Sequence, residues 1–183
     1  MEQILLDRYI AKFDELNTLD VYSVILSADN YKKAIELFDD ILIDAYIEGF
    51  ASAAYILGED RQIDNAQMQR ALEKQYGGIS IQDKVKEYYN SQDTESLKAL
   101  VDSEYHRVYN TARDNAYSDY RYKKKWVTVG DDKVRITHEF LDGVTVNANE
   151  RFNTFDGDSA LFPGDFTSAE NNANCRCIID YLP

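Results

Sequence analysis

The spacing of apolar residues changes near Tyr120, and this change constrains the fold more than any other feature of the chain. Before it, apolar residues recur every three or four positions, which is the period of a helix with one buried face. After it, short apolar runs alternate with Gly, Asn and Asp turns, which is typical of short strands. We therefore predict an α+β fold, with an N-terminal helical body and a compact C-terminal module of short antiparallel strands and turns.

Five helices are predicted before the apolar spacing changes near Tyr120. Their order divides the chain into two regions. The N-terminal helical region spans residues 1–92, and the C-terminal module, which opens with a long helix, spans residues 93–183. Capping and stop residues mark the helix ends. The predicted helices are residues 4–16; a long segment capped by Asp29 and stopped by Gly58; 64–75, ended by Gly77-Gly78; a short helix capped by Ser80 with Asp83 and running to Tyr89; and a second long helix from Asp93 or Thr94 to Tyr117.

A hairpin is predicted just after the long helix. Trp126, Val127 and Val129 precede a Gly130-Asp131-Asp132 turn, and alternating apolar residues follow it. Three further short strands are predicted over residues 144–146, 151–152 and 177–181.

Composition excludes several classes of protein. Hydrophobic residues make up 44% of the 183 residues, which is enough for a real core and excludes global disorder. The formal net charge of -13 disfavours general binding to nucleic acid. No apolar run approaches the roughly 18 residues of a membrane span, and no secretory signal is recognisable, so we expect a protein that works in a reducing cytosol without membrane contact.

The chain has one concentrated basic run, Lys123, Lys124 and Lys125, beside Trp126. Such a run can grip DNA by charge and stacking, but charge runs are more often solvated faces. A solvated face is the favoured interpretation, with a weak DNA contact as the alternative.

His138 lies in a turn-rich segment between Arg135 and Asp142. A carboxylate or carbonyl there could fix one imidazole nitrogen and leave the other free, as in a general base or a metal ligand. The favoured interpretation is a histidine that ties a loop together by hydrogen bonds.

Cys175 and Cys177 are the only cysteines, and His106 and His138 are the only histidines. Together they could form a zinc site, yet their spacing departs from that of structural zinc motifs. Two buried thiols in a terminal strand are therefore favoured over a metal site of His138, Cys175 and Cys177. Arg176 would point away from both thiols and is expected to pair with Asp142 or Asp165. Gly143 and Gly164 are expected at positions where the backbone has a positive φ or closely approaches a neighbouring segment.

Several short motifs follow one another in a fixed order after Lys125: W-V-T-V-G-D-D-K-V-R-I-T-H-E-F-L-D-G, E-R-F, F-P-G-D and N-C-R-C. This order resembles the C-terminal module of phage minor head proteins, the Mu F-like or head morphogenesis family, over roughly residues 95–183. The residues that carry the resemblance are Trp126, Asp132, Arg135, His138, Asp142, Gly143, Phe152, Pro163, Gly164, Asn174, Cys175, Arg176 and Cys177.

The resemblance implies a non-enzymatic structural protein of a tailed phage or prophage head, with no cofactor. It would bind portal or capsid protein during head assembly or genome delivery, in the virion and in the host cytoplasm during assembly. Many relatives carry extra cysteines before L-D-G that form a metal-like set with C-R-C, whereas Thr137 and His138 occupy that region here. The alternative is a small nuclease-like domain, of RNase or toxin type, that uses His138 and Arg135.

Overall fold

The structure is a computed structural model that describes residues 20–58, 61–117 and 122–182. The helix predicted over residues 4–16 lies outside these ranges. The described helices are α2 (Val21–Leu26), α3 (Tyr31–Leu57), α4 (Asn65–Leu72), α5 (Ile81–Ser91), α6 (Thr94–Tyr117), α7 (Ile136–Glu139) and α8 (Ala169–Asn172). The strands are β1 (Gln75–Tyr76), β2 (Ile79–Ser80), β3 (Lys123–Val127), β4 (Thr145–Asn147), β5 (Phe152–Asn153), β6 (Ser159–Ala160) and β7 (Ile178–Leu182).

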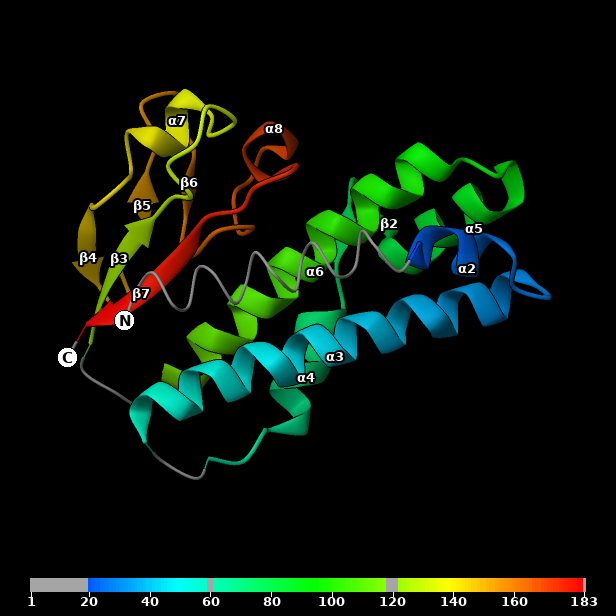
Figure 1. Ribbon diagram of the computed structural model, residues 1–183, viewed down its shortest axis with the longest axis horizontal. Helices are drawn as coiled ribbons and strands as arrows, with labels where there is room; N and C mark the ends of the chain where they lie inside the picture. The colour runs from blue at the N-terminus through cyan, green and yellow to red at the C-terminus, as the bar shows by residue number, and fades with distance from the viewer. Residues whose placement is uncertain (1–19, 59–60, 118–121, 183) are drawn as a thin grey trace.

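The two long helices, α3 and α6, form the helical body, and they lie side by side and run in the same direction (Figure 1). They approach closely at Gly49, where an added Cβ would lie 2.3 Å from the carbonyl oxygen of Tyr109. Helices α2, α4 and α5 pack against this pair. Strands β3 to β7, with α7 and α8, gather at one end of the body over the C-terminal half of α6, whereas the β1–β2 hairpin lies by α5 (Figure 1).

The observed helix ends confirm most of the predicted signals and correct two. Asn30, and not Asp29, caps α3 by accepting hydrogen bonds from the backbone of Lys32 and Lys33, and Gly58 ends that helix in the left-handed region. Ser80 accepts a hydrogen bond from the Asp83 backbone at the start of α5, as predicted. The side chain of Asp93 accepts one from Ser96 at the start of α6.

The helix predicted over 64–75 ends early, at Leu72. The Gly77-Gly78 pair does not stop a helix but forms the turn of the β1–β2 hairpin. Both glycines have positive φ, 60° and 84°, which is the conformation that a tight two-residue hairpin turn requires.

The main sheet has the order β4-β3-β7, with both pairings antiparallel. Lys124 lies opposite Tyr181 and Trp126 opposite Ile179, and both point into the core. The predicted hairpin around Gly130-Asp131-Asp132 is wrong, because β3 pairs with distant segments. Residues after the turn enter α7, which buries Thr137 and His138 and leaves Ile136 exposed.

The α+β class is confirmed, with a helical N-terminal body and short antiparallel strands. The strands predicted over 144–146, 151–152 and 177–181 fall within one or two residues of β4, β5 and β7, whereas β6 was not predicted. Among the described residues, no helix combines the length and apolar character needed to cross a bilayer.

Candidate functional site

A buried thiol–imidazole cluster lies at the centre of the C-terminal module, and we define it as His138, Cys175 and Cys177. The Nδ1 atom of His138 lies 3.5 Å from the Sγ of Cys175 and 3.4 Å from the Sγ of Cys177. All three side chains are almost fully buried. His138 is therefore neither a solvent-exposed base nor a loop histidine held by oxygen atoms.

Local backbone geometry brings the two thiols to the same side. Asn174 adopts a left-handed conformation with φ of 53°, which Asn tolerates better than most residues. The chain then becomes extended into β7, so that Cys175 and Cys177 are buried while Arg176 between them is partly exposed. The prediction that Arg176 faces away from both thiols agrees with this pattern.

Aromatic rings enclose the imidazole. Phe166 stacks against His138 at 5.2 Å between ring centroids, and Trp126 meets it edge-on at 5.4 Å. Phe152, one of the residues that carry the motif, packs edge-on against Trp126. The Nε2 atom of His138 is buried and makes no hydrogen bond within the described part of the chain.

His106 reaches the same place from the helical body. Its wide spacing from the other three residues in the sequence counted against a shared site. In the structure His106 is buried on α6, near enough to Cys175 to lower the pKa of that thiol. All four of the protein's Cys and His residues thus lie in one region of the fold.

The pKa values of the two thiols are shifted in opposite directions. Burial would raise the pKa of Cys175, but its hydrogen bond with Cys177 and the neighbouring His106 and His138 lower that pKa well below its ordinary value. The same hydrogen bond, together with burial, raises the pKa of Cys177. The pair therefore behaves as one coupled group in which Cys175 ionises first.

Hydrogen bonds made by Arg135 and Asp142, which we call the polar ties, hold together the loops around the cluster. The guanidinium of Arg135, the residue before α7, donates to the carbonyl oxygens of Asn171 on α8 and of Ala173 just after it. Asp142 accepts hydrogen bonds from both the backbone N–H and the hydroxyl of Thr128, at 2.8 and 3.0 Å. Each of these contacts joins segments that are far apart in the sequence.

Arg176 makes a structural ion pair, but not with a predicted partner. It binds the carboxylate of Asp131 through two hydrogen bonds of 2.8 and 2.7 Å. Asp142 is occupied by Thr128, and Asp165 pairs with Arg151. Asp131 therefore supplies the carboxylate of this ion pair, and it is exposed, as is Asp132, the residue that the motif singled out.

The motif glycines behave as predicted. Gly143 has φ of 75° and Gly164 φ of 94°. An added Cβ on Gly164 would lie 2.9 Å from the Cα of Arg107, so the Pro163-Gly164 turn, which is buried, packs directly on α6. This contact attaches the C-terminal module to the helical body.

Asp158, Asn171 and Asn172, which were not predicted as site residues, also hold loops together. Asp158 accepts hydrogen bonds from the backbone of Ser159, Thr167 and Ser168. The two asparagines are buried on α8, and Asn172 exchanges two hydrogen bonds with the backbone of Phe166. A D-G-D-S turn and the capping Ser168 were the available signals.

The basic run does not form a continuous cationic face. The side chain of Lys124 is fully buried, donates to the carbonyl oxygen of Leu161 and lies 4.0 Å from Asp114. The expectation of a DNA contact is therefore wrong for Lys124, because this lysine faces the core side of β3. Lys123 remains exposed and Lys125 is half-buried.

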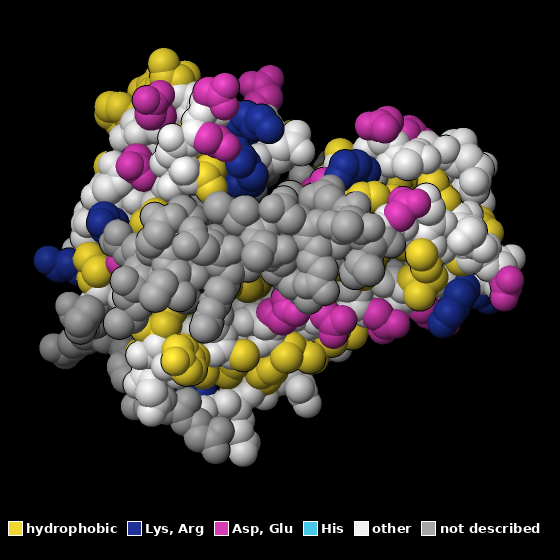
Figure 2. All heavy atoms as spheres, viewed as in Figure 1, with side chains coloured by type: hydrophobic (Ala, Val, Ile, Leu, Met, Phe, Trp, Pro, Cys, Tyr) yellow, Lys and Arg dark blue, Asp and Glu magenta, His cyan; other side chains and the backbone are white. Residues whose placement is uncertain are grey.

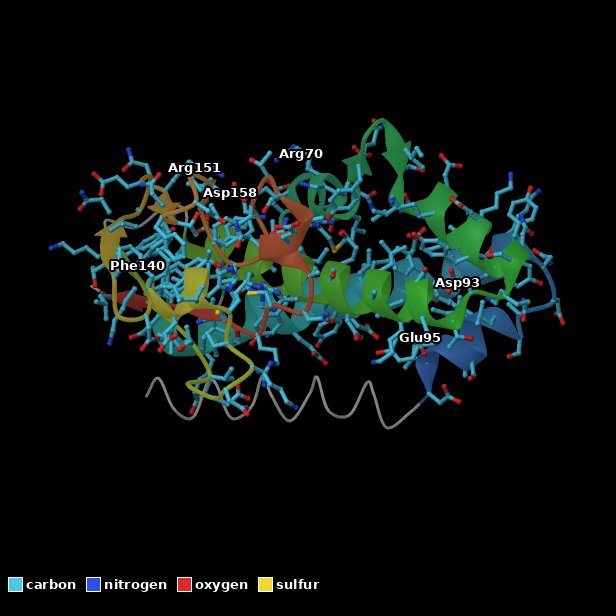
Figure 3. The ribbon with its side chains drawn as sticks, turned by 90° about the horizontal axis from the view of Figure 1, so that it is seen from above. Arg70, Asp93, Glu95, Phe140, Arg151 and Asp158 are labelled. Atoms are coloured by element: carbon cyan, nitrogen blue, oxygen red, sulfur yellow. The ribbon has the colours of Figure 1, made fainter. Side chains whose placement is uncertain are left out.

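A second feature lies on the surface at the far end of the module. We define the apolar tip as Ile136, Phe140 and Phe155, which are 70%, 63% and 58% exposed. The two phenylalanine rings pack edge to face at 5.9 Å. Figure 2 shows hydrophobic side chains gathered over the α7 end of the molecule, and Figure 3 places Phe140 at the opposite end from Asp93 and Glu95.

Comparison with known proteins finds related sequences. The chain is 23% identical over 94% of its length to the minor head protein GP7 of Bacillus phage SPP1, of which it covers 70%. A shorter segment, 30% of the chain, is 46% identical to 11% of an NAD(+)--arginine ADP-ribosyltransferase, EFV, of Enterococcus faecalis. No solved structure matches the chain. The model of the family described as "Phage Mu protein F like protein" matches residues 62–180, a range that includes the cluster, the polar ties and the apolar tip. The chain therefore belongs to the phage Mu protein F like family.

Proposed function

We propose that this protein is a non-enzymatic minor component of a tailed phage or prophage head that binds the portal through its apolar tip. Binding would occur in the host cytoplasm during assembly, and the protein would remain in the virion for assembly or genome delivery. Membership of the family and the likeness to a minor head protein support the role in the head.

The exposed apolar tip is the observation that supports a contact with another protein. Large apolar side chains that are exposed next to one another are uncommon on monomeric proteins and mark interaction sites. Phe140 and Phe155 support each other edge to face but cover each other only in part. Aromatic residues of this kind are the usual anchors of protein interfaces.

The ties around the tip make it a rigid surface. Arg135, the residue before α7, is held to the carbonyls beside α8, and Asp131 nearby is held by Arg176. A surface that is already ordered loses little side-chain and loop freedom on binding. The net charge of -13 adds a general repulsion from packaged DNA.

Co-sedimentation with the purified portal encoded by the same phage or prophage tests the proposal. Phe140→Ser with Phe155→Ser should abolish co-sedimentation while leaving the fold unchanged, because both side chains are mostly exposed. Tyr55→Ser is the matched control, since Tyr55 is 77% exposed on α3, in the helical body. Because the contact is apolar, wild-type binding should persist as salt is raised.

Either of two binding results would contradict the proposal, and a third would move the contact to another partner. One is the absence of portal binding by the wild-type chain at any ionic strength. The other is equal binding by the double variant and the Tyr55→Ser control. Binding to capsid subunits in place of the portal would transfer the assignment to that partner and reject the portal contact.

The nuclease-like alternative lacks comparable support. His138 is buried between two thiols and two aromatic rings, and the guanidinium of Arg135 is hydrogen-bonded to backbone carbonyls. Neither group is presented to a nucleic-acid substrate. Incubation of purified protein with RNA and DNA, with and without divalent metal, should leave both substrates intact.

A further inference from the structure

We infer that His138, Cys175, Cys177 and His106 form a structural zinc site that joins the C-terminal module to helix α6. This site is independent of the proposed portal contact. Three of its ligand atoms are already grouped, and the fourth residue adjoins one of them.

The geometry of the thiol–imidazole cluster matches three corners of a zinc tetrahedron. A sulfur at roughly 2.3 Å and a nitrogen at roughly 2.05 Å from a tetrahedral zinc lie about 3.6 Å from each other. Nδ1 of His138 lies 3.5 and 3.4 Å from the two sulfurs. The three ligand atoms all lie within 4.8 Å of one another.

His106 supplies the fourth position. His106 is buried on α6 near Cys175 but lies outside the group of three ligand atoms, so a shift of its side chain would bring it to the metal. A set of two thiolates and two imidazoles is the donor set typical of structural zinc, and it satisfies all four positions without water. Helix α6 would then be linked through the metal to α7 and to the segment before β7.

Asn110 is placed to orient His106. Its amide nitrogen lies 3.3 Å from Nε2 and 3.4 Å from Nδ1 of His106, and its own Oδ1 is buried without a hydrogen-bond partner in the described residues. The same amide nitrogen donates to the backbone carbonyl oxygen of His106 at 2.9 Å, so Asn110 packs along one edge of the imidazole and fixes where the ring lies. Groups that hold a metal-bound histidine in place contribute to metal affinity, which makes Asn110 a positioning residue.

The ligands are widely spaced in the sequence, and a small cavity connects with three of them. The two cysteines are separated by one residue and the two histidines by 32 positions in sequence, so neither pair has the usual zinc-motif spacing. A small cavity of ≈ 10 Å³ lies against His138, Cys175 and Cys177 and is lined as well by Arg135 and Arg176. It has room for about one water molecule and offers an entry path for an ion.

Zinc content of the full-length chain tests the inference. After reconstitution with zinc and removal of excess metal, native mass spectrometry should show one bound zinc, an increase of about 63 Da once two displaced protons are subtracted. Cobalt in place of zinc should give the visible absorption of a tetrahedral ion together with a thiolate charge-transfer band. A wild-type chain that keeps no zinc and shows no such spectrum would overturn the site.

Variants separate the ligands from their neighbours. Cys177→Ser and His106→Ala should each lose the bound zinc. Phe166→Leu, which removes a ring stacked on His138 but no donor atom, is the matched control and should keep one zinc even if it is less stable. Retention of full affinity by His106→Ala would reject His106 as the fourth ligand.

The positioning role of Asn110 has its own readout. Asn110→Ala should weaken zinc binding roughly 10- to 100-fold, as loss of a partner to a metal-bound histidine typically does. Asn110→Asp, which replaces the amide nitrogen that donates to the His106 carbonyl oxygen, should weaken zinc binding as well. Equal zinc affinity in wild type and Asn110→Ala would contradict this role.

Discussion

At the scale of single residues, the partners of charged groups decide their roles. Lys124 belongs to a run of three lysines, yet its neighbours in space are the carbonyl of Leu161 and the carboxylate of Asp114. Burial lowers the pKa of Lys124, and the nearby carboxylate opposes that shift. Lys124 therefore contributes to the core of the module and is not available as a cationic surface group.

Asp158 links acid stability to loop structure. Burial alone would raise its pKa, but hydrogen bonds from Ser168, Asn171 and Ser159 lower it below the ordinary value of an aspartate. A folded-state pKa below the unfolded value means that this stabilisation is present above about pH 4 and is lost as the pH falls below it.

We therefore expect Asp158→Asn to reduce the free energy of unfolding by about 1 kcal/mol at pH 7, since charged hydrogen bonds to exposed loops contribute modestly. The difference from wild type should shrink as the pH falls below about 4. Urea unfolding at a series of pH values measures both effects. Asp132→Asn, an exposed acid in a neighbouring loop, serves as control, and a pH-independent difference would contradict the mechanism.

At the scale of elements, the close contact of α3 and α6 depends on a missing side chain. Gly49 lies in the middle of α3, where glycine lowers helix stability by about 1 kcal/mol relative to alanine. The residue is tolerated because the backbone of Tyr109 occupies the space that a Cβ would need. Packing outweighs helix propensity at this position.

Gly49→Ala should thus destabilise the protein, by about 1–3 kcal/mol, although alanine is the better helix former. Chemical denaturation followed by far-UV circular dichroism gives the value. Ala51→Gly, at an exposed position two residues further along α3, should lower the free energy of unfolding by about 1 kcal/mol from helix propensity alone. Stabilisation by Gly49→Ala would show that the helices separate without cost.

At the scale of the whole molecule, one hydrophobic core extends from the helical body into the C-terminal module. Buried residues run from Tyr22 and Phe38 in the body to Trp126 and Tyr181 in the sheet. Helix α6 contacts both α3 and β7, and Gly164 packs on its backbone. The two predicted regions, 1–92 and 93–183, therefore share a core at α6.

A shared core should make unfolding a single transition. We expect Trp126→Ala, which removes a fully buried ring from the module, to lower stability by about 3–5 kcal/mol. Helix loss by circular dichroism and exposure of Cys175 and Cys177 to a thiol reagent should coincide along the denaturation curve. Thiol exposure before helix loss would mean that the module unfolds separately.

The sequence by itself determined the local features of this protein. Apolar periodicity located the described long helices and three of the strands, and capping residues marked most helix ends, because both signals act within a few residues. The order of the motifs also pointed to the family that now matches residues 62–180.

Tertiary structure alone decided which distant side chains meet. It brought His106 and His138 to the neighbourhood of Cys175, paired Arg176 with Asp131, turned Lys124 inward and left Phe140 and Phe155 exposed. These outcomes depend on how β3 pairs with β4 and β7 and on where that sheet meets α6. Such pairings are set by long-range packing, and the spacing of residues along the chain carries no direct record of them.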